Sequence, residues 1–113
     1  MSAPDGPRRI VLSPRAKQDF IDILRYTGET WGQAQLVAYR DKLDGALQLI
    51  AHNAALGKTA PELPASHRLY FVGSHVIVYR DRDVSIAVVR ILHWVFLITI
   101  HLDQFTGLPG WAG

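Results

Sequence analysis

Hydrophobic residues recur at helical spacing in the first half of the chain. Ser13 followed by Pro14 is typical of a helix start, and the helix predicted from there carries an apolar stripe made of Ala16, Phe20, Ile23 and Leu24. Gly28 is its expected end. A second, longer helix is predicted by a stripe made of Leu36, Tyr39, Leu43, Ala46, Leu47 and Ile50. The link at 30–33 has the T-x-x-Q form of a capping box, and so short a link predicts an antiparallel helix hairpin.

The pattern changes to short β-branched and aromatic runs after a loop at 52–66, which contains two prolines and one glycine. Strands are predicted at 67–72, 75–80 and 84–92, with a further short strand at 8–12 before the first helix. The turns at 73–74 and 81–83 separate the last three strands and predict an antiparallel meander. This order predicts an α+β domain with two helices on one face of the sheet. The expected sheet core is Leu69, Phe71, Ile77, Val89 and Ile91.

The chain has 113 residues, which is the size of a single domain, and 49% of them are hydrophobic, which favours a folded chain over a disordered one. We expect residues 1–7 to be a flexible N-terminus and residues 8–93 to form the domain. A net charge of +2 is too small to argue for nucleic-acid binding. The absence of cysteine excludes disulfides and thiolate metal sites, and the five histidines lack metal-ligand spacing. We therefore expect no metal and no cofactor.

The most apolar stretch, 84–102, approaches the length of a membrane span. Arg90 lies in its middle and His93 follows, and a charged residue at that depth is costly without a partner. Two strands in succession are therefore favoured over a membrane span. The N-terminal residues contain no apolar signal segment, so the expected location is the cytoplasm.

Arginines inside apolar strands are the first candidates for function. Arg68, Arg80 and Arg90 either pair with carboxylates such as Asp81 and Asp83 or form a basic patch on the sheet. Such a patch would suit an acidic protein surface or a phosphate. His93 directly follows the last predicted strand and is a weaker candidate, because an isolated histidine is more often structural than catalytic.

Two aromatic residues, Tyr26 and Trp31, lie five positions apart at the link between the predicted helices. Large aromatic side chains are usually buried, so the first interpretation is that both rings pack against the hairpin turn. The alternative is an aromatic surface that contacts a partner, with Trp31 as its centre.

Three stretches resemble the ParE/RelE superfamily of bacterial toxins, and the ParE branch most closely. They are LSPRAKQDFIDILRYTGETWG at 12–32, LIAHNAALGKTAPELP at 49–64 and RLYFVGSHVIVYRDRDVSIAVVRILH at 68–93. The resemblance implies the toxin subunit of a type II toxin–antitoxin system. It also implies a cognate antitoxin that wraps and neutralises the toxin and that supplies all DNA binding.

The two branches imply different activities. ParE-like toxins are understood to inhibit DNA gyrase, with the A subunit as the expected partner, and this implies a binding surface rather than a catalytic set. RelE-like toxins are ribosome-dependent mRNA interferases, which need basic residues in the sheet and a late acid or base. Here only Arg80, Arg90 and His93 could form such a set, so a protein-binding inhibitor is favoured over an enzyme. The partner-binding candidates are Arg68, Arg80, Arg90, His93 and Trp31.

The tail at 94–113 departs from the family, whose members usually end in a short charged segment. It contains no Lys or Arg and one acid, Asp103. The apolar run at 95–100 could extend the last strand, add a strand, fill an antitoxin groove or form an oligomer interface. A changed reading frame at the end of the gene would also produce it. Because the C-terminal region is associated with toxicity in this family, an inactive homologue that still binds antitoxin is a third interpretation.

Overall fold

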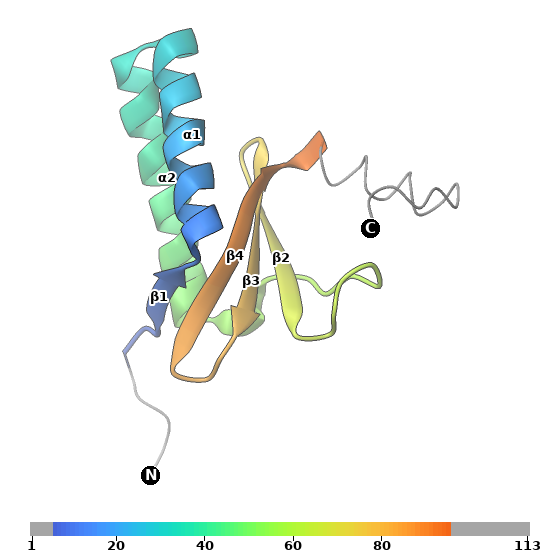
Figure 1. The fold of residues 1–113 in the computed structure, drawn as a ribbon. Coiled ribbons are helices and arrows are strands. Elements are labelled where there is room, and N and C mark those ends of the chain that lie inside the picture. The colour runs from blue at the N-terminus through green and yellow to red at the C-terminus, as the bar shows by residue number, and fades with distance from the viewer. Residues whose placement is uncertain (1–5, 96–113) are drawn as a thin grey trace, which may run out of the picture.

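The computed structural model describes residues 6–95 and has an α+β fold, as the sequence predicted (Figure 1). Strand β1 (Arg9–Leu12) is followed by helices α1 (Pro14–Trp31) and α2 (Gln33–His52) and a short 3₁₀ helix, η1 (Ala54–Leu56). Strands β2 (His67–Val72), β3 (His75–Asp81) and β4 (Ser85–His93) complete the order. The last three strands form the predicted antiparallel meander.

The sheet order is β1-β4-β3-β2, so the first strand lies beside the last one. Strand β1 pairs with β4 in parallel, from the Arg9–Ser85 pair to the Leu12–Val88 pair. Two parallel strands cannot be joined by a tight turn, and the connection between β1 and β4 is correspondingly long: it contains the helix hairpin, η1, β2 and β3. Strand β4 is therefore an inner strand, with β1 on one side and β3 on the other.

The ends of the helices differ from the prediction in two respects. Ser13 caps α1 as expected, with its hydroxyl accepting a hydrogen bond from the Ala16 N–H at 2.9 Å. The helix does not stop at Gly28 but continues to Trp31, and Gly32 makes the turn with a φ of 95°. The predicted capping box is wrong, because α2 has no side-chain cap and its N-cap is Gly32. Gly28 instead lets Leu36 approach closely, since an added Cβ would lie 2.8 Å from Leu36 Cδ1.

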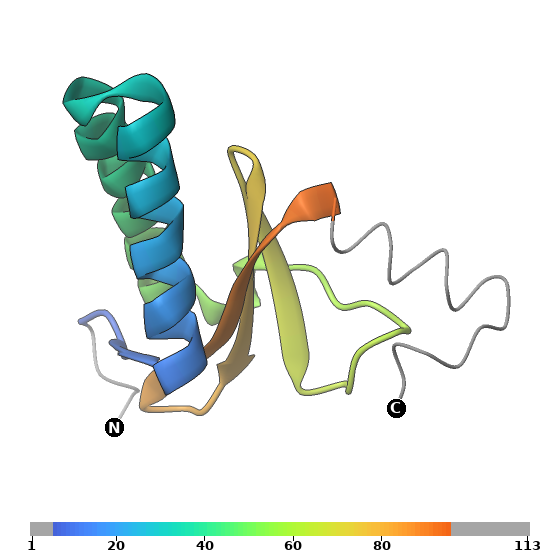
Figure 2. The ribbon, with the colours of Figure 1, turned by 45° about the horizontal axis from the view of Figure 1, so that its top comes forward.

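Between the sheet and the helices lies the main core. It is made of Ala16, Ala46, Leu47, Ile50, Ala54, Ile77, Tyr79, Ile86, Val88 and Ile91. Leu36 and Tyr39, near the start of α2, are only partly buried. Figures 1 and 2 give the reason, because the end of the hairpin where α1 joins α2 projects past the sheet. We call this projecting end the hairpin tip.

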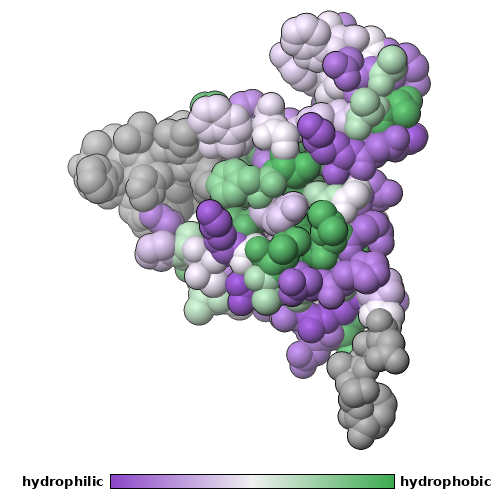
Figure 3. Space-filling model, turned by 180° about the vertical axis from the view of Figure 1, so that it is seen from behind, coloured by the Kyte–Doolittle hydropathy of each residue, from purple (hydrophilic) through white to green (hydrophobic). Residues whose placement is uncertain are grey.

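The opposite face of the sheet has a second, smaller core of Leu69, Val76 and Val78, which the loop residues Ala60 and Leu63 help to cover. Val89 and Leu92 pack at its margin. Phe71 was predicted to belong to the sheet core, and this is wrong, because its side chain is 50% exposed on edge strand β2. Seen from behind, hydrophobic side chains gather in the middle of the surface among hydrophilic ones (Figure 3).

Within residues 6–95, no helix has the length and apolarity needed to cross a bilayer. The apolar stretch that raised the question forms β4 as far as His93. The predictions for residues 96–113, including those for most of the apolar run, lie outside the described residues.

Candidate functional site

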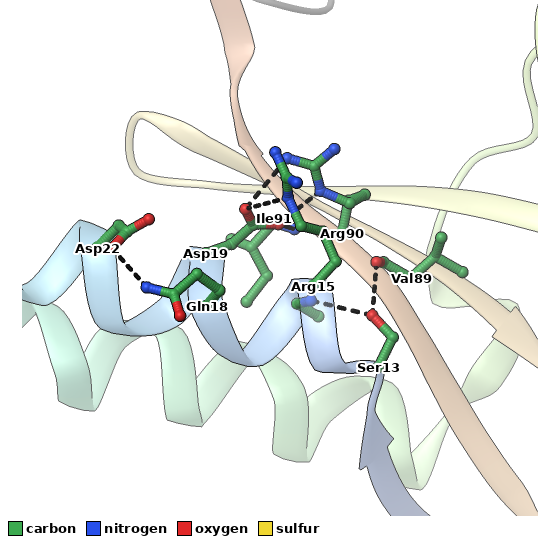
Figure 4. Close-up of polar contacts among 9 residues, drawn as sticks. Ser13, Arg15, Gln18, Asp19, Asp22, Val89, Arg90 and Ile91 are labelled. Atoms are coloured by element: carbon green, nitrogen blue, oxygen red, sulfur yellow. Dashed lines mark hydrogen bonds and ion pairs between the residues drawn. The ribbon is translucent and has the colours of Figure 1, made fainter.

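The first turns of α1 cover the part of the β4 edge that β1 leaves unpaired. Strand β1 reaches only to Val88, so the edge beyond it needs other hydrogen-bond partners. The Ser13 hydroxyl donates to the carbonyl of Val89 at 2.9 Å, and the Asp19 carboxylate accepts from the Ile91 N–H at 3.0 Å. Figure 4 shows both side chains reaching from the start of α1 to the strand.

Asp19 also holds Arg90, so this arginine has a carboxylate partner that the sequence did not indicate. Arg90 donates from Nε to Oδ2 at 2.7 Å and from Nη2 to Oδ1 at 3.1 Å (Figure 4). The Asp19 side chain is only 11% exposed. Hydrogen bonding to Asp19 raises the pKa of Arg90, so the guanidinium stays charged. A forked pair of this kind fixes the arginine and occupies the Nε–Nη2 edge of its guanidinium, one of the edges that could bind a phosphate.

Arg68 and Arg80 lie on neighbouring strands but on opposite faces of the sheet. Arg68 is paired in register with Tyr79, on the helix side, and donates from Nη1 to the carbonyl of Gly57 at 2.8 Å. Arg80 is paired with His67 on the other face, and its buried Nε has no hydrogen-bond partner within residues 6–95. Burial, and then the charge of Arg80, lower the pKa of His67. The described structure does not pair Arg80 with Asp81, which instead binds Arg8.

His93 ends β4 and belongs to a cluster with Tyr39, His75 and Trp94. His75 is its cross-strand partner, with ring centroids 5.3 Å apart, and Trp94 stacks on it at 5.8 Å. The Tyr39 hydroxyl lies 2.5 Å from Nδ1 of His75 and accepts from the Ser74 N–H at 3.0 Å. Burial and the neighbouring His93 lower the pKa of His75 to about 4, so its imidazole is neutral at pH 7.

The register separates the three residues that a ribonuclease would need together. Arg80 and Arg90 lie on the face turned away from the helices, since Arg90 is paired with Val78 of the second core. His93 is paired with His75, which contacts Tyr39 of α2, so it lies on the helix side. The described residues also contain no group of three or more His, Asp or Glu side chains that could hold a metal ion.

The aromatic pair at the hairpin tip is exposed rather than packed. The Tyr26 side chain is 64% exposed and that of Trp31 is 68% exposed. The packing interpretation is therefore wrong for both rings, for the same reason that Leu36 is half-buried: the sheet does not reach the tip. The five partner-binding candidates are thus spread over three places, namely the two faces of the sheet and the hairpin tip.

Sequence reasoning missed Asp19 and the Tyr39–His75 contact. Asp19 lies outside the apolar stripe predicted for its helix, and no sequence pattern indicated that it contacts the sheet. Strand lengths give one indirect indication. Strand β1 has four residues and β4 has nine, so β1 leaves part of the β4 edge unpaired, and another segment must cover that part.

Comparisons with known proteins show the family. Residues 10–94 match the family described as the ParE toxin of the type II toxin-antitoxin system, parDE. Toxin ParE1 of Caulobacter vibrioides is 35% identical over 91 residues, which are 80% of this chain and 94% of that protein. Toxin ParE1 of Mycobacterium tuberculosis is 34% identical over 86 residues, covering 75% of this chain and 88% of that protein.

Solved structures share the fold at low sequence identity. A chain of the chromosomal ParDE system from P. aeruginosa superposes with a TM-score of 0.65 at 14% identity, covering 76% of this chain and 95% of that one. A chain of the RelBE2 toxin–antitoxin complex from Mycobacterium tuberculosis gives 0.56 at 17% identity, covering 77% and 98%.

Proposed function

The chain belongs to the ParE toxin family of type II toxin–antitoxin systems, and from that premise we propose that it stops growth by binding DNA gyrase. The observation that carries the proposal is the match to ParE1 toxins over nearly their whole length, at about one third identity. In this proposal the toxin binds the gyrase A subunit in the cytoplasm, blocks supercoiling and replication, and itself performs no chemistry.

The separation of Arg80 and Arg90 from His93 supports binding over RNA cleavage. An acid or base and the cation that stabilises the reacting phosphate must reach the same phosphate, within hydrogen-bond distance of it. Here the arginines and the histidine lie on opposite faces of the sheet, and Arg90 is already occupied by Asp19. The mRNA interferase therefore remains the second candidate.

We further propose that a cognate antitoxin neutralises the chain. The names of the two structural relatives describe toxins with their antitoxins, as ParDE and RelBE2. The chain has exposed apolar side chains on which such a partner could lie, including Phe71, Val84 and Leu56. In this scheme the antitoxin also carries the DNA contacts that regulate the operon.

The test is to induce the chain alone in bacteria and to measure plasmid supercoiling and mRNA integrity separately. We expect growth arrest, loss of negative supercoiling and intact mRNA, with rescue by the product of the neighbouring open reading frame. Cut mRNA with normal supercoiling would establish the interferase instead. Normal growth with a stable antitoxin complex would establish an inactive homologue.

The hairpin tip offers a second arm of the test. Trp31→Ala removes an exposed ring at the proposed partner surface, and we expect supercoiling inhibition to weaken about tenfold, as for an interface hot spot. Val84→Ala is the matched control, because Val84 is 76% exposed at the other end of the molecule. Equal inhibition by both variants would remove Trp31 from the gyrase surface and leave the other candidates to be tested.

A further inference from the structure

An apolar groove of about 430 Å³ lies at β1, between the first half of α1 and the second half of α2. Its lining residues are Ile10, Leu12, Lys17, Phe20, Ile21, Asp44, Leu47 and Gln48. None of the partner-binding candidates discussed above lies in it. We call this feature the β1 groove.

Strand β1, which contributes Ile10 and Leu12 to the β1 groove, is an edge strand with unused backbone groups. The Ser13 N–H donates to the carbonyl of Val88 on β4, and the Arg8 N–H donates in the opposite direction, to Ala51 of α2. Backbone groups alternate in direction along a strand, so Ile10 and Leu12 share the direction of Arg8 and point away from β4. Their two N–H and two C=O groups have no hydrogen-bond partner within residues 6–95.

We propose that the β1 groove receives an extended apolar segment of the antitoxin, which adds to β1 as a new edge strand; this rests on the proposed neutralisation by an antitoxin. An extended peptide can satisfy the outward groups of Ile10 and Leu12, whereas a helix has already used its own backbone groups. Alternate side chains of the added strand would then lie on Phe20, Ile21 and Leu47.

The charges of the groove define the peptide further. Lys17 projects from α1 and Asp44 from α2, and neither has an ion-pair partner within residues 6–95. A complementary segment therefore carries an acidic residue that faces Lys17 and a basic residue that faces Asp44. Two opposite charges at different places on the segment favour one direction of the added strand.

The first test is amide hydrogen exchange, measured by NMR on the full chain alone and in complex with the product of the neighbouring open reading frame. We expect exchange at Ile10 and Leu12 to slow at least about a hundredfold in the complex, since these amides gain partners. A tight complex with unchanged exchange at both amides would overturn the inference while leaving the proposed function standing. Failure of any complex to form would count against both.

Free-chain exchange separates the other occupants of the β1 groove. Slow exchange at Ile10 and Leu12 that depends on concentration would assign the groove to a second copy. Slow exchange at every concentration would assign it to a segment of the same chain. Either result overturns the choice of antitoxin as occupant.

The second test uses proline, which removes one outward donor. Ile10→Pro deletes the N–H that points away from β4 and leaves the β1–β4 hydrogen bonds intact, a position that edge strands tolerate. We expect the antitoxin complex to weaken about tenfold relative to Ile10→Ala, which loses similar apolar surface but keeps the donor. Equal affinities of the two variants, at equal unfolding midpoints, would indicate a helical or side-chain-only occupant and would contradict strand addition.

The third test concerns charge. Lys17→Glu should weaken the complex several-fold and steepen its loss with salt, because it reverses one of the charges that line the groove. Lys42→Glu is the matched control, since Lys42 is exposed on α2 and does not line the groove. If both variants bind alike, the groove charges do not orient the segment.

Discussion

Asp19 on α1 accepts two hydrogen bonds from Arg90 on β4, one at each carboxylate oxygen, with N···O distances of 2.7 Å and 3.1 Å. The two residues are 71 positions apart in the sequence. The same carboxylate accepts the Ile91 N–H, so one side chain both neutralises an arginine and closes the exposed edge of a strand. The position of α1 against the sheet is thus fixed by a polar contact as well as by the core.

Replacing Asp19 should destabilise the fold. Asp19→Ala leaves the Arg90 guanidinium and the Ile91 N–H without their acceptor, and hydrogen bonds to charged groups are each worth about 1.5–3 kcal/mol. We expect a loss of about 3 kcal/mol in the free energy of unfolding by urea titration. The control is Asp22→Ala, because the Asp22–Arg25 pair is exposed on both sides and should cost about 0.5 kcal/mol or less. Similar losses in both variants would contradict this role for Asp19.

Tyr79 should contribute through its hydroxyl. The side chain is fully buried, its hydroxyl accepts from the Gly57 N–H and donates to the Ala54 carbonyl, and both distances are 2.8 Å. Tyr79→Phe leaves two buried backbone groups unpaired, so we expect a loss of about 1–3 kcal/mol by thermal or urea unfolding. Tyr70→Phe is the control, since the Tyr70 hydroxyl has no hydrogen bond within residues 6–95. If Tyr79→Phe leaves the free energy of unfolding unchanged, a water molecule replaces the hydroxyl as the partner of the two backbone groups.

Two glycines should respond to alanine in opposite directions. Gly32 turns the chain between the helices with φ 95° and ψ 172°, a conformation that is nearly exclusive to glycine, so Gly32→Ala should cost about 1–3 kcal/mol. Gly45 lies inside α2 with nothing within 4 Å of an added Cβ, so Gly45→Ala should stabilise by about 1 kcal/mol. Thermal unfolding of the two variants measures both changes. Unfolding midpoints that shift in the same direction would contradict the different roles given to Gly32 and Gly45.

His75 should make stability depend on pH. Its pKa is lowered to about 4 in the folded protein, chiefly by burial and then by His93, whereas an unfolded histidine titrates near 6.5. Between these values the unfolded state binds more protons, so stability is complete above about pH 6.5 and is lost as the pH falls towards 4. His75→Gln should flatten this dependence in urea titrations at pH 7 and pH 4.5. An NMR titration of His75 with a midpoint near 6.5 would contradict it.

The order and type of every major element could be predicted from the sequence, because each helix has an apolar stripe and each strand a run rich in β-branched, aliphatic or aromatic residues. The errors lie where tertiary contacts decide. Gly28 is a reasonable helix end in isolation, but the close approach of Leu36 requires a glycine there inside a continuous helix. Phe71 and Trp31 have the residue types of a core, but both are exposed. Phe71 lies on β2, an edge strand, and Trp31 lies at the hairpin tip, which projects past the sheet.

The candidate site was less predictable, because its residues meet only through the sheet register. The side chains of β4 alternate between the two faces of the sheet, but a register shift opposite Val78 and Tyr79 interrupts this alternation. The sequence does not reveal the shift, and the shift decides on which face Arg90 and His93 lie. Nothing local to Asp19 indicates a partner 71 positions away. The resemblance to a toxin family was confirmed because it rested on the order of several motifs and not on one residue.

The inner position of β4 also determines when the chain can fold during synthesis. Strand β1 and the helix hairpin are synthesised first, yet within residues 6–95 the partner of β1 is β4, the last strand. The β1 edge therefore stays unpaired while β2 and β3 are synthesised. Strand β1 can join the sheet only after Ser85 to Val88 have left the exit tunnel. A nascent chain interrupted before β4 therefore lacks the scaffold on which either a target or an antitoxin would be recognised.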